Sequence, residues 1–158
     1  MKHLALGFAL VVMATLFSLG TVKAVTAYND SLSGSQTAST VVDGIAINLS
    51  ATGDLPGMAK INLQRNGLNV TGGGWTMTVL PQNADASSNG RGDLTGTVSG
   101  GALTLNADGT LASASALQLT IQSGTGEFAG VTAGTGTINV STSSENPSQL
   151  AGTLVLSF

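Results

Sequence analysis

The sequence predicts an all-β protein: a single antiparallel β-barrel of about eight strands that follows an N-terminal signal peptide. Apolar residues occupy every second position in segments such as LQLTIQ (residues 117–122), which is typical of strands with one buried face. Turn dipeptides containing glycine or asparagine separate these segments. The chain after the signal has no strong helical pattern, so short strands rich in Gly and Thr indicate a sandwich or a barrel.

The first 27 residues have the order of parts found in a secretory signal peptide. Residues 1–3 (MKH) are positively charged, residues 4–20 are apolar, and two small-residue cleavage sites end at Ala24 and Ala27. We expect cleavage after Ala27, with Ala24 as the alternative, and hence a secreted or periplasmic protein. An uncleaved anchor helix is the other interpretation, but the apolar run is short for a bilayer span.

The remaining chain divides into a leading segment and one domain. Residues 28–40 (YNDSLSGSQTAST) are polar and aperiodic, so we expect them to be flexible, ahead of a β-barrel domain over residues 41–158. Strand patterns fall on residues 41–49, 58–63, 75–79, 117–122 and 150–158, and residues 94–105 are predicted to form a hairpin closing at Ser99-Gly100-Gly101. Turns are predicted at Asn66-Gly67, Gly72-Gly73-Gly74, Ser88-Asn89-Gly90 and Asp108-Gly109.

Composition excludes several chemistries. The only histidine, His3, lies in the predicted signal, and the chain has no cysteine. The mature protein therefore has no histidine- or cysteine-based nucleophilic machinery, no zinc site of these residues and no disulfide. Removal of the signal leaves three basic and eight acidic residues, a net charge of −5, which disfavours nucleic acid as a partner. No later segment has the length and apolarity of a membrane-spanning helix.

The glycine-rich stretch SGTGEFAGVTAGTG (residues 123–136) does not fit a nucleotide-binding loop. A dinucleotide fingerprint needs G-x-G-x-x-G before a helix, whereas Gly124, Gly126 and Gly130 are spaced one residue too far and precede a strand-like segment. A P-loop needs a lysine, and none lies beyond Lys60. No segment gathers three carboxylates for Ca²⁺ either. We predict no cofactor and no metal, with the glycines in turns and bulges and Phe128 in the core.

The same stretch resembles the G-G-T-G-x-F-x-x-A-x-G segment of allene oxide cyclase and dirigent-type barrels. It is more similar to secreted bacterial proteins of uncharacterised function that carry GGTGxFAGxTGxGT, and this similarity extends over most of the mature chain. The matching residues are Gly124, Thr125, Gly126, Phe128 and Gly130, while Ser123 replaces the first glycine. The resemblance implies an eight-stranded antiparallel barrel, a homotrimer as in the plant relatives, and structural roles for the matched residues. It assigns no catalytic residue.

Arg91-Gly92-Asp93 spells the integrin-recognition tripeptide within a polar loop, where we expect it to be exposed. Glycine and aspartate are also simply good turn formers, so turn chemistry explains the tripeptide without a receptor.

Three functional interpretations remain open. The first is a non-enzymatic secreted or periplasmic barrel that binds a small apolar ligand or an envelope component. The second is a cyclase-like or dirigent-like barrel that steers a reactive intermediate by shape, and the third is an extracellular adhesive or structural protein. The barrel interior separates them, because a ligand pocket needs space and a few convergent polar groups. Trp75 and Phe128 pointing inward among Leu119, Ile121 and Leu156 would instead fill it.

Overall fold

The structure is a computed structural model, and it describes residues 25–40, 42–82, 90–143 and 146–158. The predicted signal up to Ala24 and the predicted turn residues Ser88 and Asn89 lie outside the described residues.

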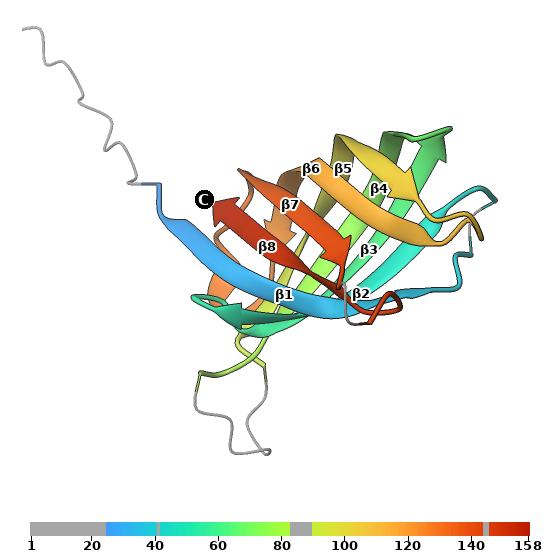
Figure 1. The fold of residues 1–158 in the computed structure, drawn as a ribbon. Helices are drawn as coiled ribbons and strands as arrows, with labels where there is room; N and C mark the ends of the chain where they lie inside the picture. The colour runs from blue at the N-terminus through green and yellow to red at the C-terminus, as the bar shows by residue number, and fades with distance from the viewer. Residues whose placement is uncertain (1–24, 41, 83–89, 144–145) are drawn as a thin grey trace, which may run out of the picture.

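Eight antiparallel strands close into one barrel, which confirms the predicted fold class (Figure 1). Each strand pairs with its neighbours in the chain, and β1 pairs with β8 to complete the ring. The strands are β1 (Ala27–Thr37), β2 (Ile45–Gly53), β3 (Gly57–Asn66), β4 (Asn69–Val79), β5 (Gly92–Leu105), β6 (Leu111–Gly124), β7 (Gly134–Thr142) and β8 (Leu150–Ser157). One 3₁₀ turn, η1 (Gly126–Phe128), lies between β6 and β7. Closure leaves the sheet without a free edge.

Strand β1 corrects the prediction that residues 28–40 are flexible. It pairs with β2 from Asp30 to Thr37 and with β8 from Ala27 to Gly34. Leu32 points into the core and is 3% exposed, while the alternate residues face solvent. The prediction failed because the order of this segment comes from hydrogen bonding to two strands distant in sequence, which local composition does not reveal.

Two predicted turns are instead parts of long strands. Residues 94–105 form no hairpin, because they belong to the continuous 14-residue strand β5, whose register with β6 shifts around Gly100. Gly72-Gly73-Gly74 lies inside β4, next to a register shift in the pairing of β3 with β4. Glycine tolerates bulges and tight bends as well as turns, so the same residues indicated the wrong structure here.

The other element predictions agree with the structure. The patterns at residues 58–63, 75–79, 117–122 and 150–158 fall on β3, β4, β6 and β8. The predicted strand at 41–49 begins at Ile45, and Val41 lies outside the described residues. Asn66-Gly67 and Asp108-Gly109 form turns, in which Gly67 and Gly109 have φ of 62° and 84°.

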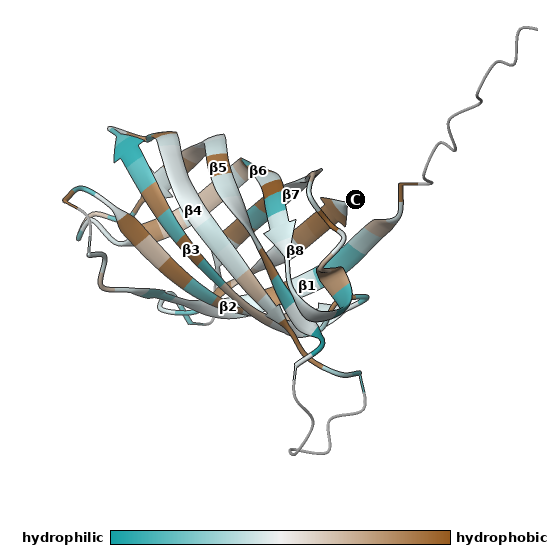
Figure 2. Cartoon of the chain, turned by 180° about the vertical axis from the view of Figure 1, so that it is seen from behind, coloured by the Kyte–Doolittle hydropathy of each residue, from teal (hydrophilic) through white to brown (hydrophobic). Residues whose placement is uncertain are grey.

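Alternation along each strand places apolar side chains inside the barrel and polar ones outside. Along β3, for example, Ala59, Ile61 and Leu63 are buried while the residues between them are exposed. The bands of alternating hydropathy on the strands follow this pattern (Figure 2). Inward apolar residues from all eight strands join one hydrophobic cluster, which occupies the barrel interior.

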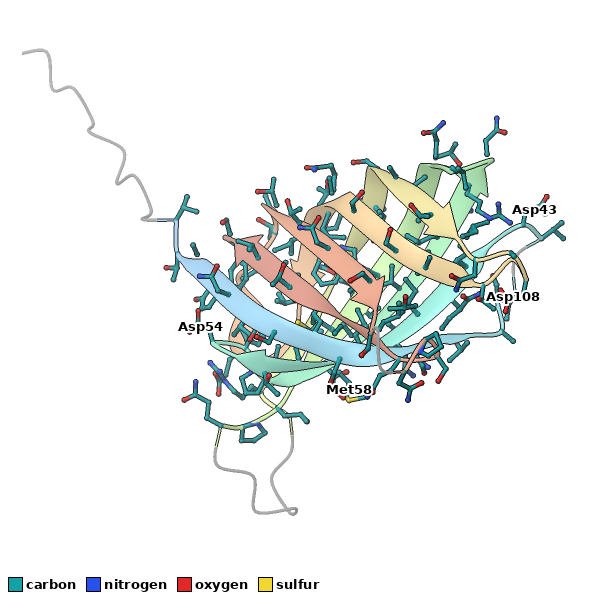
Figure 3. All side chains as sticks on the ribbon, viewed as in Figure 1. Asp43, Asp54, Met58 and Asp108 are labelled. Carbon is teal, nitrogen blue, oxygen red and sulfur yellow. The ribbon has the colours of Figure 1, made fainter. Side chains whose placement is uncertain are left out.

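The barrel has two different ends. The terminal end carries the start of β1, the end of β8 and the β2–β3, β4–β5 and β6–β7 connections, whereas the mouth end carries the other four connections. Asp54 lies at the terminal end, and Asp43 and Asp108 lie at the mouth end (Figure 3).

Candidate functional site

The interior of the barrel is filled by side chains. Trp75 is 3% exposed and Phe128 is 5% exposed, and both belong to one cluster with Leu119, Ile121 and Leu156. This is the arrangement expected of a packed core rather than of a ligand cavity. Binding by this barrel therefore has to be sought at its ends and on its outer wall.

The mouth end carries a hollow of about 600 Å³ with an apolar floor and a polar rim. Buried Leu111 and Leu150 form the floor. The rim includes Gln36, Asn106, Asp108, Thr110, Thr142 and Ser148, contributed by β1, the β5–β6 turn, the end of β7 and the β7–β8 connection. Barrel mouths are frequent places for small-molecule sites, and apolar walls with a few polar groups are their usual lining.

Hydrogen bonds fix the rim side chains in place. The Gln36 Oε1 atom accepts from the Leu111 backbone N–H at 2.7 Å, which ties the end of β1 to the start of β6. In the β5–β6 turn, Asp108 Oδ1 accepts from the Thr110 hydroxyl at 2.6 Å and from the Thr110 N–H at 2.9 Å. Asn106 Nδ2 donates to the same Thr110 hydroxyl at 3.0 Å. The polar rim is therefore preorganised.

Asp108 gives the mouth a negative charge. The hydroxyl of Thr110 and then its backbone N–H stabilise the carboxylate, so the pKa of Asp108 lies below its ordinary value. The group is ionised at neutral pH, and it is fully exposed to solvent, so its field over the hollow is weak.

The sequence motif lies at the opposite end of the barrel. Gly124 ends β6, Gly126 and Phe128 are in η1, and Gly130 follows in the connection to β7. Thr125 holds this segment to the start of β5, because its hydroxyl accepts from the Asp93 N–H at 2.9 Å and its own N–H donates to the Asp93 carbonyl at 2.9 Å. These contacts hold the β6–β7 connection against the start of β5.

The Arg91-Gly92-Asp93 tripeptide is built into this junction, contrary to the expectation of an exposed loop. The Arg91 side chain forms an ion pair with Glu127 at 2.8 Å and lies over the ring of Phe128, 5.6 Å from its centroid. Gly92 begins β5, and all three residues are half-buried. The Arg91 side chain, which an integrin would need, is thus engaged within the protein.

The sequence did not predict the hollow at the mouth end. The Asp108-Gly109 turn was identified, but nothing in the sequence indicates that Gln36 and Ser148 lie beside it. One local pattern, Asn106-x-Asp108-x-Thr110, could have drawn attention to this turn. Its three polar side chains form hydrogen bonds with one another.

Within the described residues, no three His, Cys, Asp or Glu side chains are grouped in a way that could hold a metal ion. Over the same residues, no helix has the length and apolarity needed to cross a membrane.

The fold and the mouth define a class: a closed eight-stranded antiparallel barrel with a packed interior and a polar-rimmed hollow at one end. No family model, curated protein or solved structure matches the chain.

Proposed function

We propose that this protein is a non-enzymatic secreted or periplasmic β-barrel that binds a small, largely apolar molecule at its mouth. The observation that carries the proposal is the hollow of about 600 Å³, with Leu111 and Leu150 as floor and a fixed ring of amide, hydroxyl and carboxylate groups. The apolar floor supplies affinity by releasing water, and the ring orients the bound molecule. Secretion rests on the signal-like N-terminus, which lies outside the described residues.

Steering of a reactive intermediate, the second interpretation, receives less support. Such a role needs a space that holds the intermediate away from water. The interior is packed with apolar side chains, and the mouth is open to solvent. A binding role makes no such demand.

The test measures binding of Nile red, a neutral apolar fluorophore, to the mature protein. Thr142→Phe fills the mouth, and we expect it to weaken binding at least about tenfold. Thr132→Phe is the matched control, because Thr132 lines a separate, mainly apolar hollow of about 480 Å³ at the terminal end. Loss of binding in Thr132→Phe alone would move the site to the terminal end and overturn the proposal. Native mass spectrometry of protein from its own host then identifies any retained ligand.

A further inference from the structure

The outer wall of the barrel is almost free of charge. Of the charged side chains that the structure describes, Lys60 alone lies in the middle of the wall, while the others lie at the two ends or, like Asp30, face inward. The wall presents hydroxyl and amide groups instead, among them Asn62, Thr76, Thr78, Thr120, Asn139 and Thr153. A surface of this kind offers many neutral hydrogen-bond donors and acceptors and almost no long-range field.

The wall is hollowed at one place, across strands β3 to β6. The hollow has a volume of about 280 Å³, and its polar rim consists of Lys60, Asn62, Thr76, Thr95 and Gln122. Because alternate residues of a strand point to the same face, these side chains come from outward positions of four neighbouring strands. Five side chains with neutral or cationic donors therefore surround one depression.

Gly74 leaves the hollow open, and the fold does not require a glycine there. A Cβ atom at Gly74 would meet nothing closer than the Gly96 carbonyl oxygen at 3.9 Å, and its φ is not in the left-handed region. The neighbouring Gly73 differs, since its φ is 154° and a Cβ there would overlap the Asn62 carbonyl oxygen. Glycine inside a strand lowers stability, and close approach of another molecule is one reason for it.

Trp75 lies beneath the hollow. It points inward from β4 and is 3% exposed, and its Nε1 donates to the Thr120 carbonyl oxygen at 3.3 Å across Gly96. Gly96 has to be glycine, because a Cβ there would overlap that carbonyl oxygen. Gly74, Gly96 and the indole edge thus form a floor without a protruding side chain.

We propose that this wall hollow binds one sugar ring of a neutral polysaccharide. The rim supplies the amide and hydroxyl groups that pair with sugar hydroxyls, and the floor, which has no protruding side chain, leaves room for the ring. Apart from Lys60, the described wall around the hollow carries no charge, which favours a neutral ligand, and the protein as a whole is acidic and repels polyanions. The wall continues beyond the hollow with further hydroxyl-bearing side chains, such as Thr78 on β4 and Thr120 on β6, which suits a polymer better than a free sugar.

Trp75 provides the test, since it is the only tryptophan in the chain and forms part of the floor. Its emission is followed during titration with the neutral oligosaccharides maltoheptaose and cellohexaose, and with oligogalacturonate as the acidic counterpart. We expect a saturable change with at least one neutral oligosaccharide, with an affinity that is insensitive to salt because no charge pairing is involved. No change with either neutral oligosaccharide at millimolar concentration overturns the proposal, as does a salt-sensitive response confined to oligogalacturonate.

Two valine variants locate the binding. Gly74→Val fills the hollow and should weaken binding at least about tenfold, and valine is favoured in strands, so the variant should fold. Gly100→Val is the matched control, because a Cβ at Gly100 meets nothing within 4 Å and this residue lies outside the hollow. Equal affinity in Gly74→Val and the wild type would show that the sugar binds elsewhere. Thr142→Phe, which fills the mouth, should leave sugar binding unchanged.

Discussion

Asp30 places a carboxyl group on the inward face of β1, where it is 4% exposed. Its Oδ1 atom accepts from the Leu55 N–H at 2.8 Å, but its Oδ2 atom is buried and has no hydrogen-bond partner among the described residues. Burial raises the pKa of Asp30, the hydrogen bond from Leu55 opposes this, and the charge of Asp54 in the adjacent turn raises the pKa further. The neutral, protonated carboxyl is therefore the form that suits this site.

This residue should make the stability of the protein pH-dependent. The folded protein holds the Asp30 proton to a higher pH than the unfolded chain does, whose pKa is 3.8. The contribution to stability is thus fully present below pH 3.8 and is lost as the pH rises through the folded pKa. Asp30→Asn keeps an acceptor for Leu55 and removes the ionisable group. We expect it to flatten this pH dependence and to raise the free energy of unfolding at pH 7 by about 1 kcal/mol.

Urea denaturation across the acidic range measures this effect. Asp43→Asn makes the same change in net charge at an exposed loop residue and should retain the pH dependence of the wild type. A pH profile of Asp30→Asn that parallels the wild type would show that Asp30 is not the group responsible.

Single residues also show where sequence reasoning reaches its limit. Gly72-Gly73-Gly74 is one pattern in the sequence, yet Gly73 is demanded by its φ and by the Asn62 carbonyl, whereas Gly74 has open space around it. The difference depends on which neighbouring strand lies beside each residue. The burial of Asp30 could not be predicted either, because its polar neighbours in the sequence suggested a solvated segment. Only the pairing of β1 with β2 and β8 buries it.

The junction between the start of β5 and η1 joins two elements that are more than 30 residues apart in the chain. Besides the paired hydrogen bonds of Thr125 and Asp93, the Glu127 N–H donates to the Arg91 carbonyl at 2.8 Å. The backbones approach so closely that a Cβ at Gly126 would overlap the Arg91 carbonyl oxygen, and Gly126 has φ of 57°. The motif glycine is therefore needed for both its backbone conformation and its lack of a side chain.

Gly126→Ala should separate β5 from η1. We expect the free energy of unfolding to fall by about 3 kcal/mol, because backbone strain and the loss of packing act together. Gly109→Ala is the matched control, since Gly109 has φ of 84° but nothing lies within 4 Å of its Cβ position. In Gly109→Ala the free energy of unfolding should fall only by the cost of the backbone strain, about 1 kcal/mol. Equal losses in the two variants, measured by urea denaturation, would contradict a role for the close approach.

Among the secondary-structure elements, the sequence predicted the strands better than the turns that connect them. Alternation over residues 117–122 and 150–158 identified β6 and β8, because half-buried strands impose that period on the sequence. The predicted hairpin at 94–105 failed because glycine at residue 100 marks a register shift within a long strand, and a turn would have the same composition.

For the whole molecule, the distribution of residue types is more informative than any motif. Among the described residues, apolar side chains fill the interior, the charged ones other than Asp30 and Lys60 lie at the ends, and neutral polar side chains cover most of the wall. The fold class could be predicted because it depends on patterns that repeat along the chain. The mouth and the wall hollow could not, because each combines residues from three or more elements whose adjacency is set by closure. The homotrimer implied by the resemblance stays a prediction, which light scattering of the mature protein would test.

Hydrogen bonds between Thr26 and Phe158 bear on where the predicted signal peptide is cleaved. The Thr26 N–H donates to the Phe158 carbonyl at 3.1 Å and the Phe158 N–H donates to the Thr26 carbonyl at 3.3 Å, so the ladder between β1 and β8 extends ahead of Ala27. Cleavage after Ala27 would remove this pair, whereas cleavage after Ala24 retains it. On this ground we predict a mature chain that begins at Val25, in place of the site that the sequence favoured.

Two protein chains test this prediction, one beginning at Val25 and one at Tyr28. The shorter chain loses both Thr26–Phe158 hydrogen bonds and the pairing of Ala27 with Ser157, and β8 is left with an unpaired end. We expect its free energy of unfolding to be lower by about 1–2 kcal/mol, at about 1 kcal/mol for each net hydrogen bond. The intact mass of the protein purified from its own host should correspond to the longer chain. A measured mass that corresponds to a chain beginning at Tyr28, together with equal stability of the two chains, would contradict the prediction. It would mean that the barrel closes fully without the Thr26–Phe158 hydrogen bonds.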